Sequence, residues 1–422
     1  MRIRSRRRRA VAVISGAVMS ALLLAGCSFG GTVEPDLPAQ VDGSFPDETI
    51  QQLTDAVTHA MGTTGSSGAI VGVWAPWSGS WVTGLGTQRP DGGGEVTADL
   101  RFRGGKITRA MTCDILYGVA ADGKVQLGDS ITEYVAGVPD LKDVSLLELC
   151  DGTSGIGSYA GQLYASWITN PGRDWDPRYL ASFGLGQPRS TEPGAAYRDS
   201  DAGYVLLGLA MQRATGASAA ELLQTYVADP LGLDATELGD LPSDGALQGG
   251  QSVNNAEGAL DCAQPVDLTA ASGSSGFTDA GVVTDIEDLG RYVQALASGA
   301  LVTDDDRFAS PLPVSADGPT WYTADGGALM AGSLVGQYGK VPGYITAAFA
   351  DAKSGLTVAV VLNNSAADGA VGEYLAWELA AIASKAPAAE GETVPEAGLP
   401  WTPEQYHDAI SAAAVCTPPA AE

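Results

Sequence analysis

The stretch that decides the fold reads FRGGKITR and runs from Phe102 to Arg109. An apolar-periodic segment follows and closes at an Asp-Gly turn signal, so the sequence predicts a buried helix that begins near Lys106. Lys106 and Arg109 are three residues apart and therefore share one face of this helix. The next segment, Gly123–Val135, reads GKVQLGDSITEYV.

These two segments resemble the serine β-lactamase and DD-peptidase family, whose members typically read FRIGSVTK followed by a GKL-LDD-V-Y segment. In that family a serine nucleophile begins the helix, and a lysine three residues later takes its proton. The ungapped alignment places Lys106 at the serine position and Arg109 at the lysine position. Lysine has no hydroxyl and a guanidinium stays charged at any working pH, so neither residue can perform the family role.

The second family motif corresponds to Pro193–Gly208, which reads PGAAYRDSDAGYVLLG and resembles PGTRFSYSNAGYVLLG. The matching flanks place Asp199 at the tyrosine position and Asp201 at the asparagine position, and they keep Ser200. Aspartate at the third position also occurs in active relatives. A carboxylate, however, cannot replace a phenol that relays a proton, because its reach and its pKa both differ.

The third family motif offers His or Lys, any residue and Gly on the strand beside the scissile bond. Here the run is GQYGKVPGY, and its Pro-Gly-Tyr turn places Gln337 at the basic position. The steering cation of the family is therefore missing. The resemblance places four further residues at the cleft: Ser154, Tyr338, Gly339 and Tyr344.

A displaced catalytic motif is the main competing interpretation. None of the six lysines has a serine three residues upstream, and no Gly-x-Ser-x-Gly elbow occurs. The only histidines, His59 and His407, lie near the two ends of the chain, which disfavours a Ser-His-Asp triad.

The substitutions form a charge pattern. The helix gains Lys106 and Arg109, and the facing motif gains Asp199 and Asp201. In the family fold these positions converge on one pocket, so we expect a salt bridge between one of the cations and one of the carboxylates. A single change would leave a buried unpaired charge at a cost of about 3–5 kcal/mol. The alternative is a set of surface charges in an open, wet pocket.

The first 26 residues predict a lipoprotein signal peptide. Six arginines in the first nine residues precede an apolar run, which ends in the lipobox Leu-Ala-Gly-Cys27. An uncleaved anchor is the alternative, and Sec and twin-arginine export both stay open. Removal of this segment leaves 17 basic and 50 acidic residues, a net charge near −33 that disfavours nucleic acid as a partner.

Four cysteines remain besides Cys27, an even number that suits an oxidising compartment. Class A β-lactamases often join the two corresponding helices, so the resemblance implies a Cys113–Cys150 bond and leaves Cys262 for Cys416. Sequence alone selects none of the three possible pairings, and four free thiols are the alternative. No Cys-x-x-Cys spacing occurs, so we predict no metal and no cofactor.

The order of elements predicts an α+β protein with a β-lactamase/transpeptidase-like fold, an antiparallel sheet flanked by helices with an inserted α-helical lobe. We expect a flexible tether over residues 27–46, the β-lactamase-related domain over 47–385, and a loose Ala/Pro-rich tail over 386–422 unless Cys416 pins it. The helical lobe should span roughly residues 124–250.

Function does not follow from fold alone. The degenerate positions favour a lipid-anchored pseudoenzyme on the extracytoplasmic face of the cell membrane. Its partner would be a peptidoglycan fragment or an envelope protein. The alternative is an active serine hydrolase (a β-lactamase, a D-Ala-D-Ala carboxypeptidase or an esterase) that uses an unrecognised nucleophile.

Overall fold

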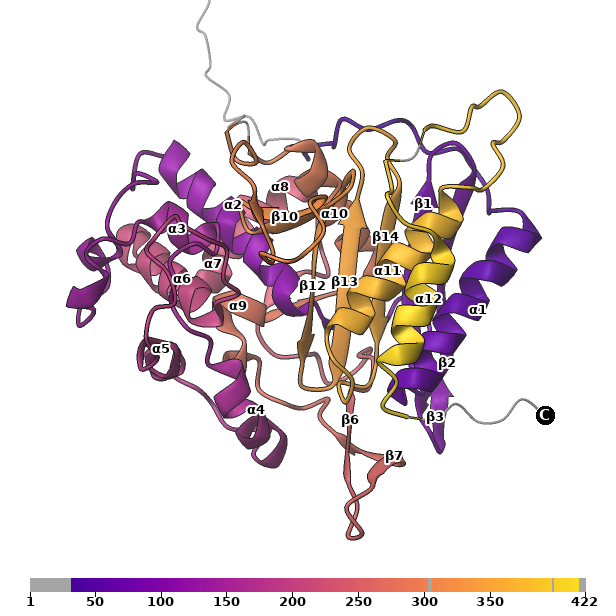
Figure 1. Cartoon of the computed structure of the whole chain (residues 1–422), viewed down its shortest axis with the longest axis horizontal. Coiled ribbons are helices and arrows are strands. Elements are labelled where there is room, and N and C mark those ends of the chain that lie inside the picture. Colours follow the sequence, from indigo (N-terminus) through magenta and orange to yellow (C-terminus); the bar gives the residue numbers. More distant parts are fainter. Residues whose placement is uncertain (1–31, 303–305, 397, 417–422) are drawn as a thin grey trace, which may run out of the picture. The chain divides into compact units, whose positions relative to one another are not determined.

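A nine-stranded antiparallel sheet is the largest sheet of the computed structural model, which describes residues 32–302, 306–396 and 398–416 (Figure 1). The strand order is β3-β2-β1-β14-β13-β12-β11-β10-β9. β1 and β14 lie far apart in the sequence but pair directly, with Ala69 opposite Leu362. The strands are β1 Gly68–Ala75, β2 Gly79–Arg89, β3 Gly92–Glu95, β9 Leu312–Pro313, β10 Tyr322–Asp325, β11 Ala328–Ala331, β12 Leu334–Val341, β13 Tyr344–Ala350 and β14 Thr357–Leu362.

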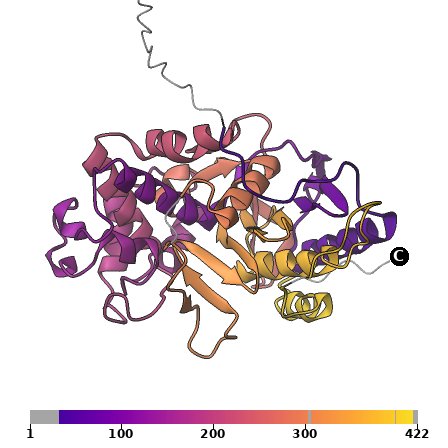
Figure 2. The same cartoon turned by 90° about the horizontal axis from the view of Figure 1, so that it is seen from above.

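Helices cover both faces of this sheet because its central strands carry apolar side chains on both sides. Every residue of β13 and β14 is buried, as expected for strands with two covered faces. One face packs against α11 (Ala370–Ala383), which α1 (Asp47–Thr64) and α12 (Pro403–Ala412) flank (Figures 1 and 2). The other face packs against α10 (Ile286–Ser298).

The remaining α-helices form a lobe beside the sheet (Figure 1). They are α2 Thr108–Ala121, α3 Leu146–Cys150, α4 Ala160–Thr169, α5 Pro177–Leu185, α6 Asp201–Thr215, α7 Ala219–Leu223, α8 Asp229–Leu231 and α9 Phe277–Ala280. Two of them, α2 and α9, lie outside the range 124–250 expected for the lobe. Two small sheets complete the fold: β4 Phe102–Arg103, β8 Val282–Thr284 and β5 Glu237–Leu238 in one, and β6 Gly250–Asn254 with β7 Leu260–Asp267 in the other. This architecture confirms the predicted fold class.

Two segments have local structure that the sequence did not specify. The apolar run 328–335 divides into β11 and β12 at a turn where Gly332 has a φ of +58°, a backbone conformation that favours glycine. The C-terminal segment contains α12, whose N-terminus has a capping box between Thr402 and Gln405. This part of the tail is therefore ordered, as the sequence allowed if Cys416 were bonded.

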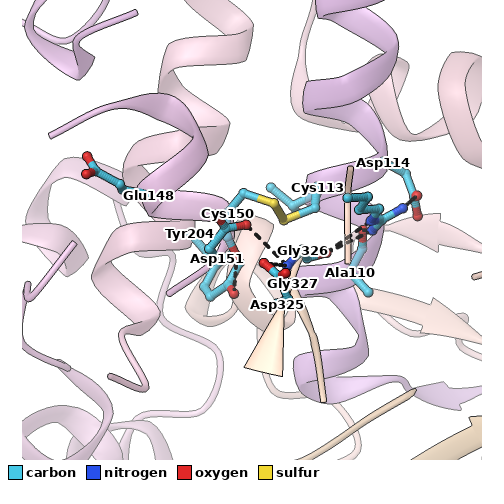
Figure 3. The surroundings of a disulfide bond; sticks show 12 residues. Ala110, Cys113, Asp114, Glu148, Cys150, Asp151, Tyr204, Asp325, Gly326 and Gly327 are labelled. Atoms are coloured by element: carbon cyan, nitrogen blue, oxygen red, sulfur yellow. Dashed lines mark hydrogen bonds and ion pairs between the residues drawn. A yellow bond between two sulfur atoms is a disulfide. The ribbon is translucent and has the colours of Figure 1, made fainter. Parts of the chain in front are cut away.

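Two disulfides are present among the described residues, with the pairing that the family resemblance implied. Cys113 on α2 bonds Cys150 at the end of α3, with Cα atoms 5.4 Å apart (Figure 3). Cys262 on β7 bonds Cys416, with Cα atoms 6.0 Å apart. The second bond ties the segment after α12 to the β6–β7 hairpin.

The signal peptide and the lipidation residue Cys27 lie outside the described residues. Within the described ranges, no helix combines the length and apolarity needed to cross a bilayer.

Candidate functional site

Lys106 lies on the 3₁₀ turn Gly105–Ile107 that leads into α2, and it faces a pocket of about 210 Å³. Asp199 and Gln337 line the same pocket, so the three substituted motifs meet as the register predicted. The Lys106 side chain is 26% exposed. The other lining residues are Tyr197, Arg198, Val314, Tyr322, Leu329 and Tyr338.

The cations and carboxylates form a continuous chain of ion pairs. Asp199 accepts from Lys106 Nζ at 2.5 Å through Oδ2 and from Arg109 Nη2 at 2.8 Å through Oδ1. Arg109 also donates from Nε to Asp279 Oδ1 at 2.7 Å, and its guanidinium lies over the ring of Tyr204 at 4.8 Å. Two positive groups thus balance two negative ones, and the expected salt bridge between the motifs is present.

The balance of charge matters because two of the four side chains, Arg109 and Asp279, are buried. The Arg109 side chain is 1% exposed and that of Asp279 is 7% exposed, whereas Asp199 is 49% exposed. Desolvation opposes ionisation of Asp199, but the charges of Arg109 and Lys106 outweigh it and hold its pKa well below the usual range. Desolvation also dominates at Asp279 and raises its pKa despite the attraction of Arg109.

Asp201 does not pair with either cation, which corrects the expectation that it faces them. It is 1% exposed and accepts backbone N–H bonds from Tyr159 at 2.6 Å and Ala160 at 2.8 Å, at the start of α4. Its own helix, α6, begins at this residue, so its carboxylate lies at the N-terminal ends of two helices. Burial, followed by the charge of Asp279, raises its pKa to about 6.

The strand beside the pocket offers no cation at the family's basic position. Gln337 is 3% exposed, and its side chain donates to the carbonyl of Gly327 at 3.2 Å and accepts from the N–H of Tyr338 at 3.0 Å. Lys340, three residues further along β12, donates to the carbonyl of Ala367 at 2.9 Å. The hydrogen bonds described for these two side chains all go to backbone groups outside the ion pairs.

Of the four other residues expected at the cleft, two are there. Tyr338 lines the pocket, and Gly339 lies so close to Lys106 that a Cβ on it would be 2.6 Å from the lysine Cγ. Tyr344 instead lies in the core, fully buried, and donates its hydroxyl to the carbonyl of Leu247 at 2.5 Å. Ser154 is 1% exposed, and its hydroxyl accepts from the N–H of Ile156 at 3.4 Å, because the tight Gly-rich loop turns it inward.

Asp279, the second carboxylate of the ion-pair chain, was not predicted from the sequence. It occurs in the otherwise apolar segment GFTDAGVV, where a lone acidic residue was the available signal. Sequence reasoning also missed buried Glu373 on α11, which accepts from the hydroxyl of Tyr322 on the pocket wall. Desolvation raises the pKa of Glu373 to about 8. Among the described residues, no three His, Cys, Asp or Glu side chains gather in a group that could hold a metal ion.

The family profile described as Beta-lactamase matches residues 53–381. The chain belongs to the Beta-lactamase family. Its match to penicillin-binding protein 4* of Bacillus subtilis strain 168 is 26% identical over 110 residues, and it spans only 24% of that protein and 26% of this chain.

Solved structures place the same fold in several hydrolases and binding proteins. A D-stereospecific amidohydrolase from Streptomyces sp. is 21% identical with a TM-score of 0.63, covering 74% of this chain and 94% of that one. The D-amino acid amidase of Ochrobactrum anthropi SV3 is 20% identical with a TM-score of 0.63 over 75% and 93%. A penicillin-binding protein from Bacillus halodurans is 17% identical with a TM-score of 0.61 over 76% and 96%. At identities this low, the structural likeness establishes a common fold and no more.

The link between the two motifs can be measured with a double-mutant cycle. We expect Asp199→Ala to destabilise the protein by about 1–3 kcal/mol, because it leaves buried Arg109 with one carboxylate. We expect Asp199→Ala combined with Lys106→Ala to cost less than the sum of the single changes, by about 0.5–1 kcal/mol, since both side chains are partly exposed. Urea unfolding measures all four proteins.

The pH dependence of this coupling has a definite sign. The lowered pKa of Asp199 stabilises the folded state at pH values above the ordinary aspartate pKa, and the contribution is lost as the pH falls through the folded-state value. The coupling should therefore be equal at pH 7 and pH 5. Strict additivity at both values would mean that the two side chains do not interact.

Proposed function

We propose that this chain is a non-catalytic member of its family, lipid-anchored at Cys27 on the extracytoplasmic face of the cell membrane, with a binding or regulatory role in the envelope. The observation that carries the proposal is the ion-pair chain from Lys106 through Asp199 and Arg109 to Asp279. It occupies the positions where the family places its nucleophile, its base and its tyrosine.

The chemistry of these groups supports the proposal. Acyl transfer in this family needs a hydroxyl nucleophile and a neutral base that can take its proton. Lys106 offers an ammonium that is bonded to a carboxylate, and Arg109 offers a guanidinium that stays protonated. A carboxylate with a lowered pKa, such as Asp199, is a weak proton acceptor.

The rival function, an active hydrolase with another nucleophile, would need an activated serine near the cluster. Ser200 is 2% exposed and caps α6, accepting from the N–H of Gly203 at 3.1 Å. Ser158 donates to the backbone carbonyl of Asp199 at 3.0 Å. Bonds to backbone groups hold both hydroxyls, and neither is paired with a base.

A serine reintroduced at position 106 tests the proposed lack of catalysis. We expect Lys106→Ser to show no turnover of a penicillin or a D-Ala-D-Ala ester above the rate without protein, because Arg109, Asp199 and Gln337 still replace the other catalytic groups. An active relative assayed in parallel is the positive control, and Ser200→Ala in the same background tests for a substitute nucleophile. Measurable turnover by Lys106→Ser would contradict the proposal.

The cellular part of the proposal has its own test. We expect the full-length chain to sediment with membranes, and Cys27→Ser to move to the soluble fraction after export. The proposed ligand is a peptidoglycan fragment or an envelope protein, and co-sedimentation with purified peptidoglycan separates these two. An unchanged membrane fraction in Cys27→Ser would rule out lipid anchoring.

A further inference from the structure

The two histidines of the chain, His59 and His407, are 348 residues apart in sequence but stack on each other. Their ring centroids are 3.9 Å apart and their planes differ by 19°. His59 belongs to α1 and His407 to α12, so the stacked pair joins the N-terminal helix to the C-terminal helix.

The surroundings of the two rings differ. His407 Nδ1 lies 3.0 Å from Oε1 of Glu378 on α11, a carboxyl group that is 3% exposed. His59 Nε2 lies 2.9 Å from the hydroxyl of Ser411, which brings no charge. His407 therefore faces an acidic side chain, whereas His59 faces a neutral hydroxyl and the other imidazole.

The other charged groups near the pair are few. Glu404 lies one turn before His407 on α12, where its negative charge acts on Glu378 and the charge of Lys385 acts on Glu404. Asp55 lies one turn before His59 on α1 and accepts from Gln51 at 2.8 Å. None of these groups forms a hydrogen bond with the His59 ring among the described contacts.

The helix that carries His407, α12, lies as a strap over an aromatic core. Tyr406 of α12 packs edge-to-face on Trp377 with centroids 4.9 Å apart, and Trp401, just before α12, donates to the Trp377 carbonyl at 3.0 Å. Trp377 in turn contacts Tyr322 at 5.1 Å, and Tyr322 lines the pocket beside Lys106. The Cys262–Cys416 bond keeps the end of the strap attached whatever its packing.

We propose that the stacked histidines form a pH-sensitive latch, which holds α12 against α1 and α11 at neutral pH and loosens it when both rings become protonated. Desolvation, followed by the charge of His407, lowers the pKa of His59. A histidine pKa that is lowered in the folded state costs stability as the pH falls below the ordinary value near 6.5. The Cys262–Cys416 disulfide keeps the end of this segment attached, so the loosening is local and reversible.

Glu378 provides a contrast of opposite sign. Burial raises its pKa although His407 acts against this, so protonation of Glu378 on its own stabilises the folded state as the pH falls. A protein that keeps Glu378 and His407 but lacks the second imidazole should therefore not loosen in acid.

Hydrogen–deuterium exchange of peptides covering residues 403–412, at pH 7.5 and pH 5.0, tests the latch in the mature chain. After correction for intrinsic exchange, we expect protection to fall about fivefold at pH 5.0, the factor for two unit charges about 4 Å apart in water. Peptides from α6 serve as the internal reference. In His59→Phe, which keeps the stacked ring, protection should stay level or rise on acidification.

His59→Lys adds a second variant with a permanent charge at this position, and its protection should still fall on acidification, as in the wild type. Equal protection of wild-type α12 at both pH values would overturn the proposal. The same loss in His59→Phe as in wild type would also overturn it, because the acid effect would then arise elsewhere.

Discussion

Arg109→Met should destabilise the protein by about 3–5 kcal/mol, the largest effect that we expect from any single substitution. The guanidinium is 1% exposed and bonds both Asp279 and Asp199, so its removal leaves the buried carboxyl of Asp279 without a counter-charge. Methionine fills much of the same volume, which limits the contribution of a cavity. Urea unfolding at pH 7 measures the loss.

Two comparisons separate charge from packing. Asp279→Asn combined with Arg109→Met should recover a large part of the loss, since a neutral carboxamide needs no counter-charge. Arg101→Met removes an arginine that pairs with Glu237 at 3.3 Å in an exposed position, and it should cost less than about 1 kcal/mol. Equal losses for Arg109→Met and Arg101→Met would show that the buried cluster adds nothing to stability.

Removal of the Cys262–Cys416 bond in the double variant Cys262→Ala/Cys416→Ala should cost about 2–5 kcal/mol. The bond closes a loop of 154 residues, against 37 for Cys113–Cys150, and a longer loop gives a larger entropic contribution in the chain-entropy account. Thermal and urea unfolding measure the loss, and α12 should lose protection from exchange more than α6 does.

Val415→Ser is the matched control, because Val415 lies next to the bridge and is 39% exposed. It should change the free energy of unfolding by less than about 0.5 kcal/mol. An unchanged stability in the double alanine variant would mean that the strap is held by its aromatic packing alone.

The register of the site could be predicted because the flanks of each motif resemble those of the serine β-lactamase and DD-peptidase family. The resemblance implied that Lys106, Asp199 and Gln337 share one pocket, and all three line it in the structure. The pairing of Cys113 with Cys150 came from the resemblance to the family, because spacing alone allows three pairings.

The ion-pair and hydrogen-bond partners of the charged residues could not be predicted from the sequence in the same way. Asp201 follows the N-cap Ser200, and its carboxylate turns toward the backbone of α4, a tertiary contact that has no local signal. Asp279 reaches Arg109 from a short helix 170 residues away in sequence. The strap α12 depends on a disulfide and on aromatic contacts with α11, and its Ala- and Pro-rich surroundings conceal it in the sequence.

Intact-mass spectrometry of the mature chain tests directly whether the protein has a catalytic serine. The chain is incubated with a fluorophosphonate and, separately, with a penicillin. An active relative treated in parallel shows that the reagents work. We expect an unchanged mass for this chain with both reagents, because a lysine paired with Asp199 occupies the nucleophile position. A stoichiometric adduct on any serine would contradict the proposal of a non-catalytic protein and identify the chain as an active hydrolase.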